Sequence, residues 1–218
     1  MLNGKIEEYL RSLVPAKPDF INEMEDYAKK EHVPIMEPEG MEFLLQLLRL
    51  RQPKAILELG TAIGYSAIRM AGAVPDAQIV TLERDEERII EAKANFAKAG
   101  VAERIRLIEG DALDNVEEAG AFGPFDMIFI DAAKGQYQRF FEHYEAFLRE
   151  GGVIVTDNVL FKGLVAGELD EIDTRRIRGL VKKIKNFNEW LAHHPHYDTV
   201  IVPIGDGVAI SKHRGEKE

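Results

Sequence analysis

The sequence of 218 residues contains no cysteine. Disulfide bonds, thiolate zinc sites, iron–sulfur clusters and a cysteine nucleophile are therefore excluded. Long apolar runs are also absent, since no uncharged stretch reaches the roughly 18 residues that a membrane-spanning helix requires. The first fifteen residues carry Glu7 and Glu8 where a signal peptide has an apolar core. These absences predict a cytoplasmic protein with no membrane partner.

Basic residues are the scarcer charged class, with 28 Lys and Arg against 38 Asp and Glu, for a formal net charge of −10. That balance argues against nucleic-acid binding over the whole surface and leaves room only for a local basic patch. The length and the 45% hydrophobic content suit one globular domain. We expect a single domain over residues 1–218, with a helical extension at 1–52 and a core at 53–212.

Helical patterns come first, from Asn3 to about Val14, from Pro18 toward His32, and from Pro38 onward. Short β-like runs then alternate with helical patterns. The expected strands are 55–59, 78–83, 104–109, 125–131 and 152–157, and the expected helices are 64–73, 85–99, 112–121 and 135–149. Strands that are apolar on both faces and separated by helices predict an α/β protein with a mostly parallel sheet covered on both sides.

The end of the chain has a different pattern. A long helix over about 173–192 precedes two β-like runs joined across Gly205-Asp206-Gly207. That turn is typical of a hairpin, so the sheet is predicted to end with an antiparallel strand.

Acidic and amide side chains follow the expected parallel strands. In open parallel sheets ligands bind outside the carboxyl ends of the strands, so these residues are expected to share one edge. Each alone is more often a helix N-cap, but their co-location favours a site. They are Glu58, Glu83, Asp111, Asp131, Asp157 and Asn158.

The glycine-containing turn from Glu58 to Ser66 has Gly60 and Gly64 but lacks the G-x-G-x-x-G spacing of dinucleotide sites. A carboxylate at Glu58 would also repel a pyrophosphate, which disfavours an NAD-binding oxidoreductase. S-adenosylmethionine (SAM) has a cationic sulfonium and ammonium, and a carboxylate that helix N–H groups or Ser66 could receive. Glu83 lies 23 positions after Gly60, about where an acidic residue binds ribose hydroxyls.

Asp131, Asp157 and Asn158 form a set of hard oxygen donors at neighbouring strand ends. Such a set suits Mg²⁺, which keeps positions open for water or substrate. Lys134 is expected one helical turn beyond Asp131, near any oxygen that the metal holds. The alternative is that Asp157 and Asn158 cap the following loop and Lys134 is solvated.

The segments ILELGTAIGYSA, GDA at 110–112, FIDAAK at 129–134 and TDN at 156–158, with Glu83 at its strand end, resemble the cation-dependent class I O-methyltransferases. This family includes the catechol and caffeoyl-CoA O-methyltransferases. The resemblance covers roughly residues 33–212 and implies a Rossmann-like fold, with a seven-stranded, mostly parallel sheet whose last strand is antiparallel. It also implies SAM and Mg²⁺, or another divalent cation, as cofactors, and suggests a homodimer.

The resemblance assigns roles by position. Lys134 would help to deprotonate the acceptor hydroxyl, and Asp131 would serve as both metal ligand and neighbour of the methyl donor. The metal ligands would be Asp131, Asp157 and Asn158. The cofactor residues would be Met36, Glu58, Gly60, Ser66, Glu83, Gly110, Asp111, Ala112 and Asp131.

The acceptor depends on the segment 174–185, TRRIRGLVKKIK, which has six basic residues and no acidic one. Arg175, Arg178, Lys182 and Lys185 share a helical face, which is either a solvated surface paired with upstream acids or a patch that follows phosphates.

The segments VLFKGLVAGE, TRRIRGLVKKI and NEWL resemble the bacterial branch that methylates 5-hydroxyuridine at the tRNA wobble position. That resemblance implies the tRNA anticodon loop as substrate. The alternative acceptor is a small catechol-type or caffeoyl-CoA-type phenol. A non-catalytic SAM-binding module is a further alternative, and it would not need the metal ligands.

Overall fold

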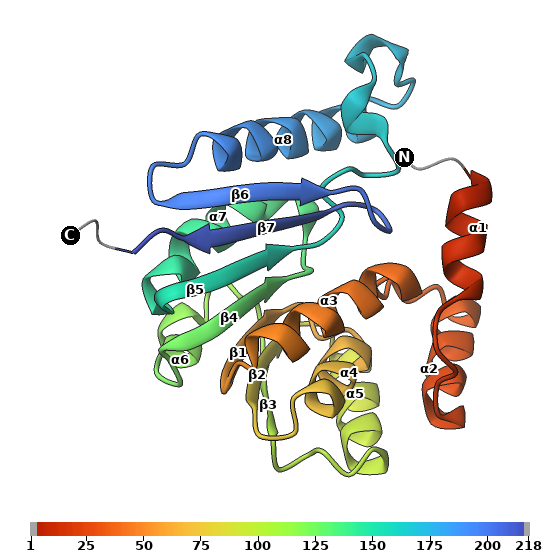
Figure 1. Ribbon diagram of the computed structural model, residues 1–218, viewed down its shortest axis with the longest axis vertical. Coiled ribbons are helices and arrows are strands. Elements are labelled where there is room, and N and C mark those ends of the chain that lie inside the picture. Colours follow the sequence, from red (N-terminus) through yellow and green to blue (C-terminus); the bar gives the residue numbers. More distant parts are fainter. Residues whose placement is uncertain (1–3, 216–218) are drawn as a thin grey trace.

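The computed structural model describes residues 4–215, which form a seven-stranded sheet with helices on both faces (Figure 1). The predicted cap at Asn3 lies outside the described residues. The strands are β1 (Ala55–Leu59), β2 (Gln78–Glu83), β3 (Ile105–Glu109), β4 (Phe125–Ile130), β5 (Leu148–Thr156), β6 (Tyr197–Val202) and β7 (Val208–His213). The helices are α1 (Gly4–Ser12), α2 (Asp19–Lys30), α3 (Pro38–Arg51), α4 (Tyr65–Ala73), α5 (Glu86–Lys98), α6 (Val116–Gly120), α7 (Tyr137–Tyr144) and α8 (Arg175–Ala192).

The strand order is β3-β2-β1-β4-β5-β7-β6. The first five strands in sequence pair in parallel, and β7 runs antiparallel to both of its neighbours, β5 and β6. This topology confirms the predicted Rossmann-like sheet with an antiparallel last strand. Because the chain winds outward in opposite directions from β1 and β4, a crevice is expected between their carboxyl ends.

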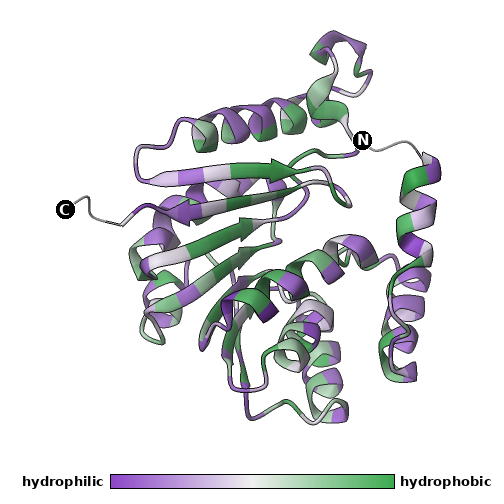
Figure 2. Ribbon diagram, viewed as in Figure 1, coloured by the Kyte–Doolittle hydropathy of each residue, from purple (hydrophilic) through white to green (hydrophobic). Residues whose placement is uncertain are grey.

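Each central strand buries side chains on both faces of the sheet. Ile56 and Phe129 pack with α2 to α5 on one face, while Leu57 and Ile128 pack with α6 to α8 on the other. Figure 2 shows the matching pattern in α8, whose hydrophobic residues face the sheet and whose hydrophilic residues face away. Over residues 4–215, no helix combines the length and apolarity needed to cross a membrane.

Two helices are shorter than their sequence patterns predict. The helix expected over 112–121 is confined to α6, because the chain first makes a turn in which Asp114 and Asn115 donate their backbone N–H groups to the carbonyl of Asp111. The helix expected over 135–149 ends at Tyr144 and passes through a 3₁₀ turn. The chain then enters β5 at Leu148, which pairs with Phe125 of β4. Strand pairing therefore overrides the local helical pattern at Leu148.

An aromatic cluster joins α7, α8 and β6 on the face of the sheet that α6 to α8 cover. The fully buried ring of Phe141 lies 5.1 Å from Trp190, 4.9 Å from Tyr197 and 6.5 Å from Phe187 between ring centroids. These distances suit edge-to-face packing, which stabilises beyond the area buried. Phe141 therefore holds α8 against the rest of the domain.

We predict that Phe141→Ala lowers the free energy of unfolding by about 3–5 kcal/mol, because a large buried ring leaves a cavity. The matched control is Leu50→Ala, since Leu50 is also helical but 73% exposed, and its truncation should cost less than about 0.5 kcal/mol. Urea denaturation followed by circular dichroism measures both. Equal losses for the two variants would contradict the assignment.

Candidate active site

A cavity of about 450 Å³ lies at the carboxyl ends of β1 to β4, in the size range of small-molecule sites. Its wall brings together most of the residues that the sequence predicted at the strand ends, with one from the N-terminal extension. The predicted residues that line it are Met36, Gly60, Ser66, Glu83, Gly110, Asp111, Ala112, Asp131, Lys134 and Asn158. Two predicted residues, Glu58 and Asp157, do not line the cavity and are buried in the protein.

The turn after β1 depends on glycine. Gly60 has φ +102°, and a Cβ placed there would lie 2.3 Å from the backbone oxygen of Asp131. Asp131 in turn donates its N–H to Leu59 O at 2.9 Å. The turn and the end of β4 therefore approach closely, with no room for a side chain between them.

Glu58 is fully buried beneath this turn. Its carboxylate accepts a hydrogen bond from the hydroxyl of Ser66 and another from Thr81 Oγ1 at 2.5 Å. Burial raises the pKa of Glu58 to about 7, and the two hydroxyl donors oppose that rise. The carboxylate thus places a negative charge behind Ser66, where a cationic group of a ligand in the cavity would stabilise it.

Two further carboxylates are ordered by backbone N–H groups. Glu83 accepts from the N–H of Ala62 at 2.8 Å and from that of Arg84 at 2.9 Å. Asp111 accepts from the N–H of Leu113 at 2.9 Å and pairs with the Arg84 guanidinium at 2.9 Å, and these contacts lower its pKa. Carboxylate oxygens keep further acceptor capacity, so both residues can receive ligand hydroxyls.

Asp131, Asp157 and Asn158 come together where β4 and β5 end. Burial raises the pKa of Asp131 well above its ordinary value, and the charge of Asp157 raises it further. Burial also raises the pKa of Asp157 to about 6, against donation from Asn158. The Lys134 ammonium hydrogen-bonds to Asn158 Oδ1, and Asn158 Nδ2 donates to Asp157 Oδ2 at 2.5 Å.

This donor set fits a hard divalent cation. Two carboxylates that repel each other when ionised gain from a positive charge between them, and an amide oxygen is a ligand of the same kind. Within residues 4–215 no group of three or more His, Cys, Asp or Glu side chains is arranged for a metal, so Asn158 would complete the set. The Lys134 ammonium contacts Asn158 Oδ1, the same oxygen that would bind such a cation.

Three residues near the site were not found from the sequence. Tyr137 is buried and donates its hydroxyl to the backbone oxygen of Asp157 at 2.8 Å, which supports the strand end. Thr81 binds Glu58 because β1 and β2 pair with these two residues opposite each other. Tyr65 lines the cavity beside Ser66. For Tyr137 the sequence offered one signal, since this residue follows the predicted Lys134 by three positions.

The basic segment forms α8, but its predicted face is divided. Arg178 donates to Ile172 O at 2.7 Å and Lys185 to Gly167 O at 3.4 Å, so both hold the segment before the helix. Arg175 and Lys182 are exposed. The next residue, Lys183, extends toward Gly135. A Cβ added to that glycine would lie 3.6 Å from Lys183 Nζ, so α8 lies beside the segment that carries Lys134.

The fold and the site define the class: a Rossmann-like protein whose ligand cavity lies at the switch point of its sheet. The family model described as O-methyltransferase matches residues 12–214, so the chain belongs to the O-methyltransferase family.

Curated relatives and solved structures agree. The chain is 35% identical to a catechol O-methyltransferase of Niastella koreensis, with 94% of this chain and 95% of that protein covered. It is 31% identical to caffeoyl-CoA O-methyltransferase 1 of Eucalyptus globulus, with coverage of 92% and 84%. An O-methyltransferase of Bacillus cereus, solved in complex with S-adenosylhomocysteine (SAH), has a TM-score of 0.83 at 27% identity, with coverage of 96% and 97%.

We predict that Glu58→Gln changes how stability depends on pH. A carboxyl with a pKa of about 7 in the folded chain and 4.5 as its ordinary value binds its proton more tightly when folded. Its contribution to stability is therefore present below pH 4.5 and is lost as the pH rises through 7. The free energy of unfolding of Glu58→Gln, relative to that of the unmodified protein, should therefore rise by about 2 kcal/mol between pH 5 and pH 8.

Urea denaturation of both proteins at each pH, without ligand, measures this difference. Ser211→Ala is a suitable control, since it removes another buried polar group without a titrating side chain. A difference that stays constant from pH 5 to pH 8 would show that Glu58 titrates normally.

Proposed function

We propose that this protein is a SAM-dependent and divalent-cation-dependent O-methyltransferase whose acceptor carries two vicinal oxygens. The observation that carries the proposal is the convergence of Asp131, Asp157 and Asn158 beside the cavity, since a set of hard oxygen donors has no role in binding SAM alone. This point also disfavours a non-catalytic SAM-binding module.

SAM suits the cavity because its charges match the residues present. The carboxylate of Glu58 favours a cationic group near Ser66, and Glu83 and Asp111 can receive ribose or base donors. Two structural relatives hold the same kind of ligand, since the Bacillus cereus enzyme was solved with SAH and TomG of Streptomyces achromogenes with SAM. The lack of a third glycine and the charge of Glu58 remain arguments against NAD.

Asp131, Asp157 and Asn158 would hold the cation, which when bound supplies Lewis acidity that lowers the pKa of an acceptor hydroxyl. Asp131 also lines the cavity, so the two halves of the site share one wall. Lys134 lies against Asn158, where its side chain, as the uncharged amine, would accept the proton of the acceptor hydroxyl. Tyr137 fixes the backbone of Asp157. Holding the acceptor oxygen in line with the methyl group can lower the activation free energy by roughly 7–11 kcal/mol.

A small aromatic acceptor with vicinal hydroxyls is the first candidate. It is favoured by the names of the relatives, which are catechol and caffeoyl-CoA O-methyltransferases matched over nearly the whole chain. A catechol offers two adjacent oxygens of the kind that the proposed site would bind.

We predict that methyl transfer from labelled SAM to catechol requires Mg²⁺ and falls at least about 100-fold in EDTA. Asp157→Ala should lose activity to a similar extent, because it removes a ligand from the proposed cation site, and it should retain SAM binding by calorimetry. Asp173→Ala is a matched control, since Asp173 is an exposed acid outside the site. Full activity of Asp157→Ala, or full activity in EDTA, would refute the cation-dependent mechanism.

tRNA carrying 5-hydroxyuridine is the second candidate, favoured by one observation. Arg175 and Lys182 are exposed on α8, and Lys183 of the same helix approaches the segment next to Lys134. A cationic surface beside the cavity is suited to phosphate contacts. The 5-hydroxyl and O4 of 5-hydroxyuridine form a vicinal oxygen pair, and the wobble base lies in a single-stranded loop from which it can be splayed into a pocket.

We predict that the double variant Arg175→Glu and Lys182→Glu separates these acceptors. If tRNA is the substrate, kcat/KM for tRNA should fall at least about tenfold and its salt dependence should weaken, with catechol methylation unchanged. The control reverses two exposed cations on other helices, Lys29 and Arg49. Methylation of catechol but not of tRNA by the unmodified protein would instead leave α8 as a solvated surface.

A further inference from the structure

The N-terminal arm, residues 4–37, lies beside the core and leads into the cavity wall. Figure 1 shows α1 and α2 standing alongside the edge of the domain formed by α3, α4 and α5. The chain leaves α2 through a turn in which Val33 donates to Ala28 O at 2.9 Å. The next residues, Pro34 to Met36, line the cavity, and Met36 is only 2% exposed. The position of α2 therefore sets the position of this wall.

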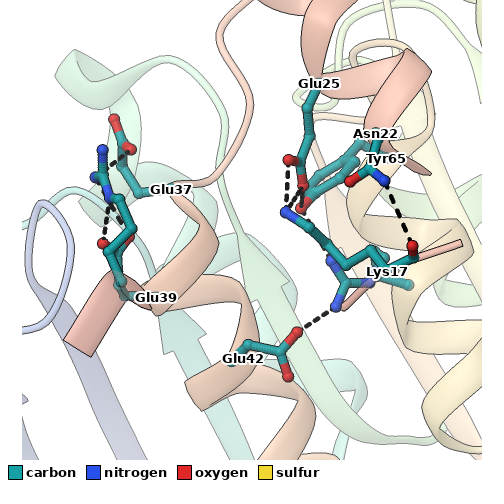
Figure 3. Close-up of polar contacts among 9 residues, drawn as sticks. Lys17, Asn22, Glu25, Glu37, Glu39, Glu42 and Tyr65 are labelled. Atoms are coloured by element: carbon teal, nitrogen blue, oxygen red, sulfur yellow. Dashed lines mark hydrogen bonds and ion pairs between the residues drawn. The ribbon is translucent and has the colours of Figure 1, made fainter. Parts of the chain in front are cut away.

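A chain of polar contacts connects the arm to the core (Figure 3). Lys17 Nζ lies 2.5 and 2.6 Å from the two carboxylate oxygens of Glu25 on α2. Glu25 Oε1 accepts a hydrogen bond from the hydroxyl of Tyr65 at 2.6 Å. The same hydroxyl accepts from Arg69 at 3.0 Å, and Arg69 pairs with Glu42 of α3.

This network is withdrawn from solvent. The side chains of Lys17, Glu25, Arg69 and Glu42 are 14%, 21%, 11% and 20% exposed. Charge-assisted hydrogen bonds in such surroundings are stronger and less screened by salt than surface pairs. Burial and the hydrogen bond to Glu25 raise the pKa of Tyr65 well above its ordinary value, so its hydroxyl stays protonated and available as a donor.

Tyr65 is the point at which the network meets the site. It is the first residue of α4, directly before Ser66, and it lines the same cavity as Pro34 and Met36. Tyr65 lines the cavity while its hydroxyl contacts Glu25. One side chain thus connects the start of α4 to α2, the helix that precedes the wall residues Pro34 to Met36.

We propose that the Glu25–Tyr65 hydrogen bond is a latch that holds residues 34–36 against the cofactor cavity and slows cofactor release. The latch rests on the proposed function in one respect, namely that SAM and SAH occupy this cavity. Glu25 and Tyr65 are positioning residues, since they act through the segment 34–36. The arm keeps other attachments to the core, because Ile21, Met24 and Ala28 are buried in the core cluster. Loss of the latch should therefore loosen the wall without detaching the arm.

The test compares Glu25→Ala and Tyr65→Phe with the matched control Glu23→Ala. Tyr65→Phe keeps the aromatic ring and removes only the hydroxyl. Glu23 lies on the same helix and also pairs with a core lysine, Lys98 at 2.7 Å, but both side chains are about 60% exposed, at 62% and 59%. The measurements are the dissociation rate of labelled SAH, the Kd for SAM by calorimetry, and hydrogen exchange at residues 33–37 without ligand.

We expect Glu25→Ala and Tyr65→Phe each to speed SAH release at least fivefold, to raise the Kd for SAM similarly and to speed exchange at residues 33–37. Glu23→Ala should change each value less than twofold. The effect of the double variant should be smaller than the two single effects combined, because both single variants remove the Glu25–Tyr65 hydrogen bond. Glu25→Ala also removes the Lys17 pair, and Tyr65→Phe also removes the Arg69 contact.

Two outcomes would overturn the latch. The first is unchanged SAH release in variants whose melting temperature falls, which would leave the network as a structural tie. The second is unchanged exchange at residues 33–37 in the unliganded variants. If the unmodified protein failed to bind SAM at all, the proposed function would fail, while hydrogen exchange would still decide whether the network holds this segment.

Discussion

Acidic side chains meet at the carboxyl edge of a parallel sheet, and their partial withdrawal from water is the constraint on which the site depends. Removing a carboxylate from water is costly unless hydrogen bonds or positive charges compensate. Each one here has a different compensation. Glu58 has two hydroxyl donors, Glu83 has backbone N–H groups, and Asp111 has Leu113 N–H with the Arg84 guanidinium. Burial outweighs the hydrogen bonds at Glu58, whose pKa rises to about 7, and it also raises the pKa values of Asp131 and Asp157, which in addition repel each other.

The unequal compensation has a chemical consequence. The contacts of Asp111 lower its pKa, so this carboxylate gives the cavity a fixed negative charge. The pair that repels itself gains most from an added cation, which is why the chemistry is expected at Asp131 and Asp157 rather than at Glu83. The glycine at position 60 makes this possible, since its missing side chain allows the turn after β1 to approach the backbone of Asp131 closely. The two halves of the proposed reaction can then share one residue.

The sequence was a good guide wherever a residue acts through its place on a strand. Runs apolar on both faces identified the parallel strands, and the rule that ligands bind at their carboxyl ends selected the cavity wall. Contacts between segments were out of reach, since no local pattern reports strand register or packing. Thr81 reaches Glu58 only because β1 and β2 align these residues, and the hydrogen bond from Tyr65 to Glu25 spans 40 positions. The helical pattern that continued past Tyr144 was wrong because pairing with β4 took over at Leu148.

Backbone strain and the β6–β7 turn together fix the loop that follows β5. Asn158, Phe161 and Lys162 all have positive φ, a conformation that costs a residue with a side chain of order 1–3 kcal/mol. The β6–β7 turn supports this loop, since Val159 N–H donates to Gly207 O and Leu160 N–H to Asp206 O, and the Asp206 carboxylate accepts from Lys162 N–H. A strained loop held from a neighbouring hairpin gives Asn158 a fixed place beside Lys134. One oxygen donor of the proposed cation site is therefore fixed by a hairpin that lies outside the parallel part of the sheet.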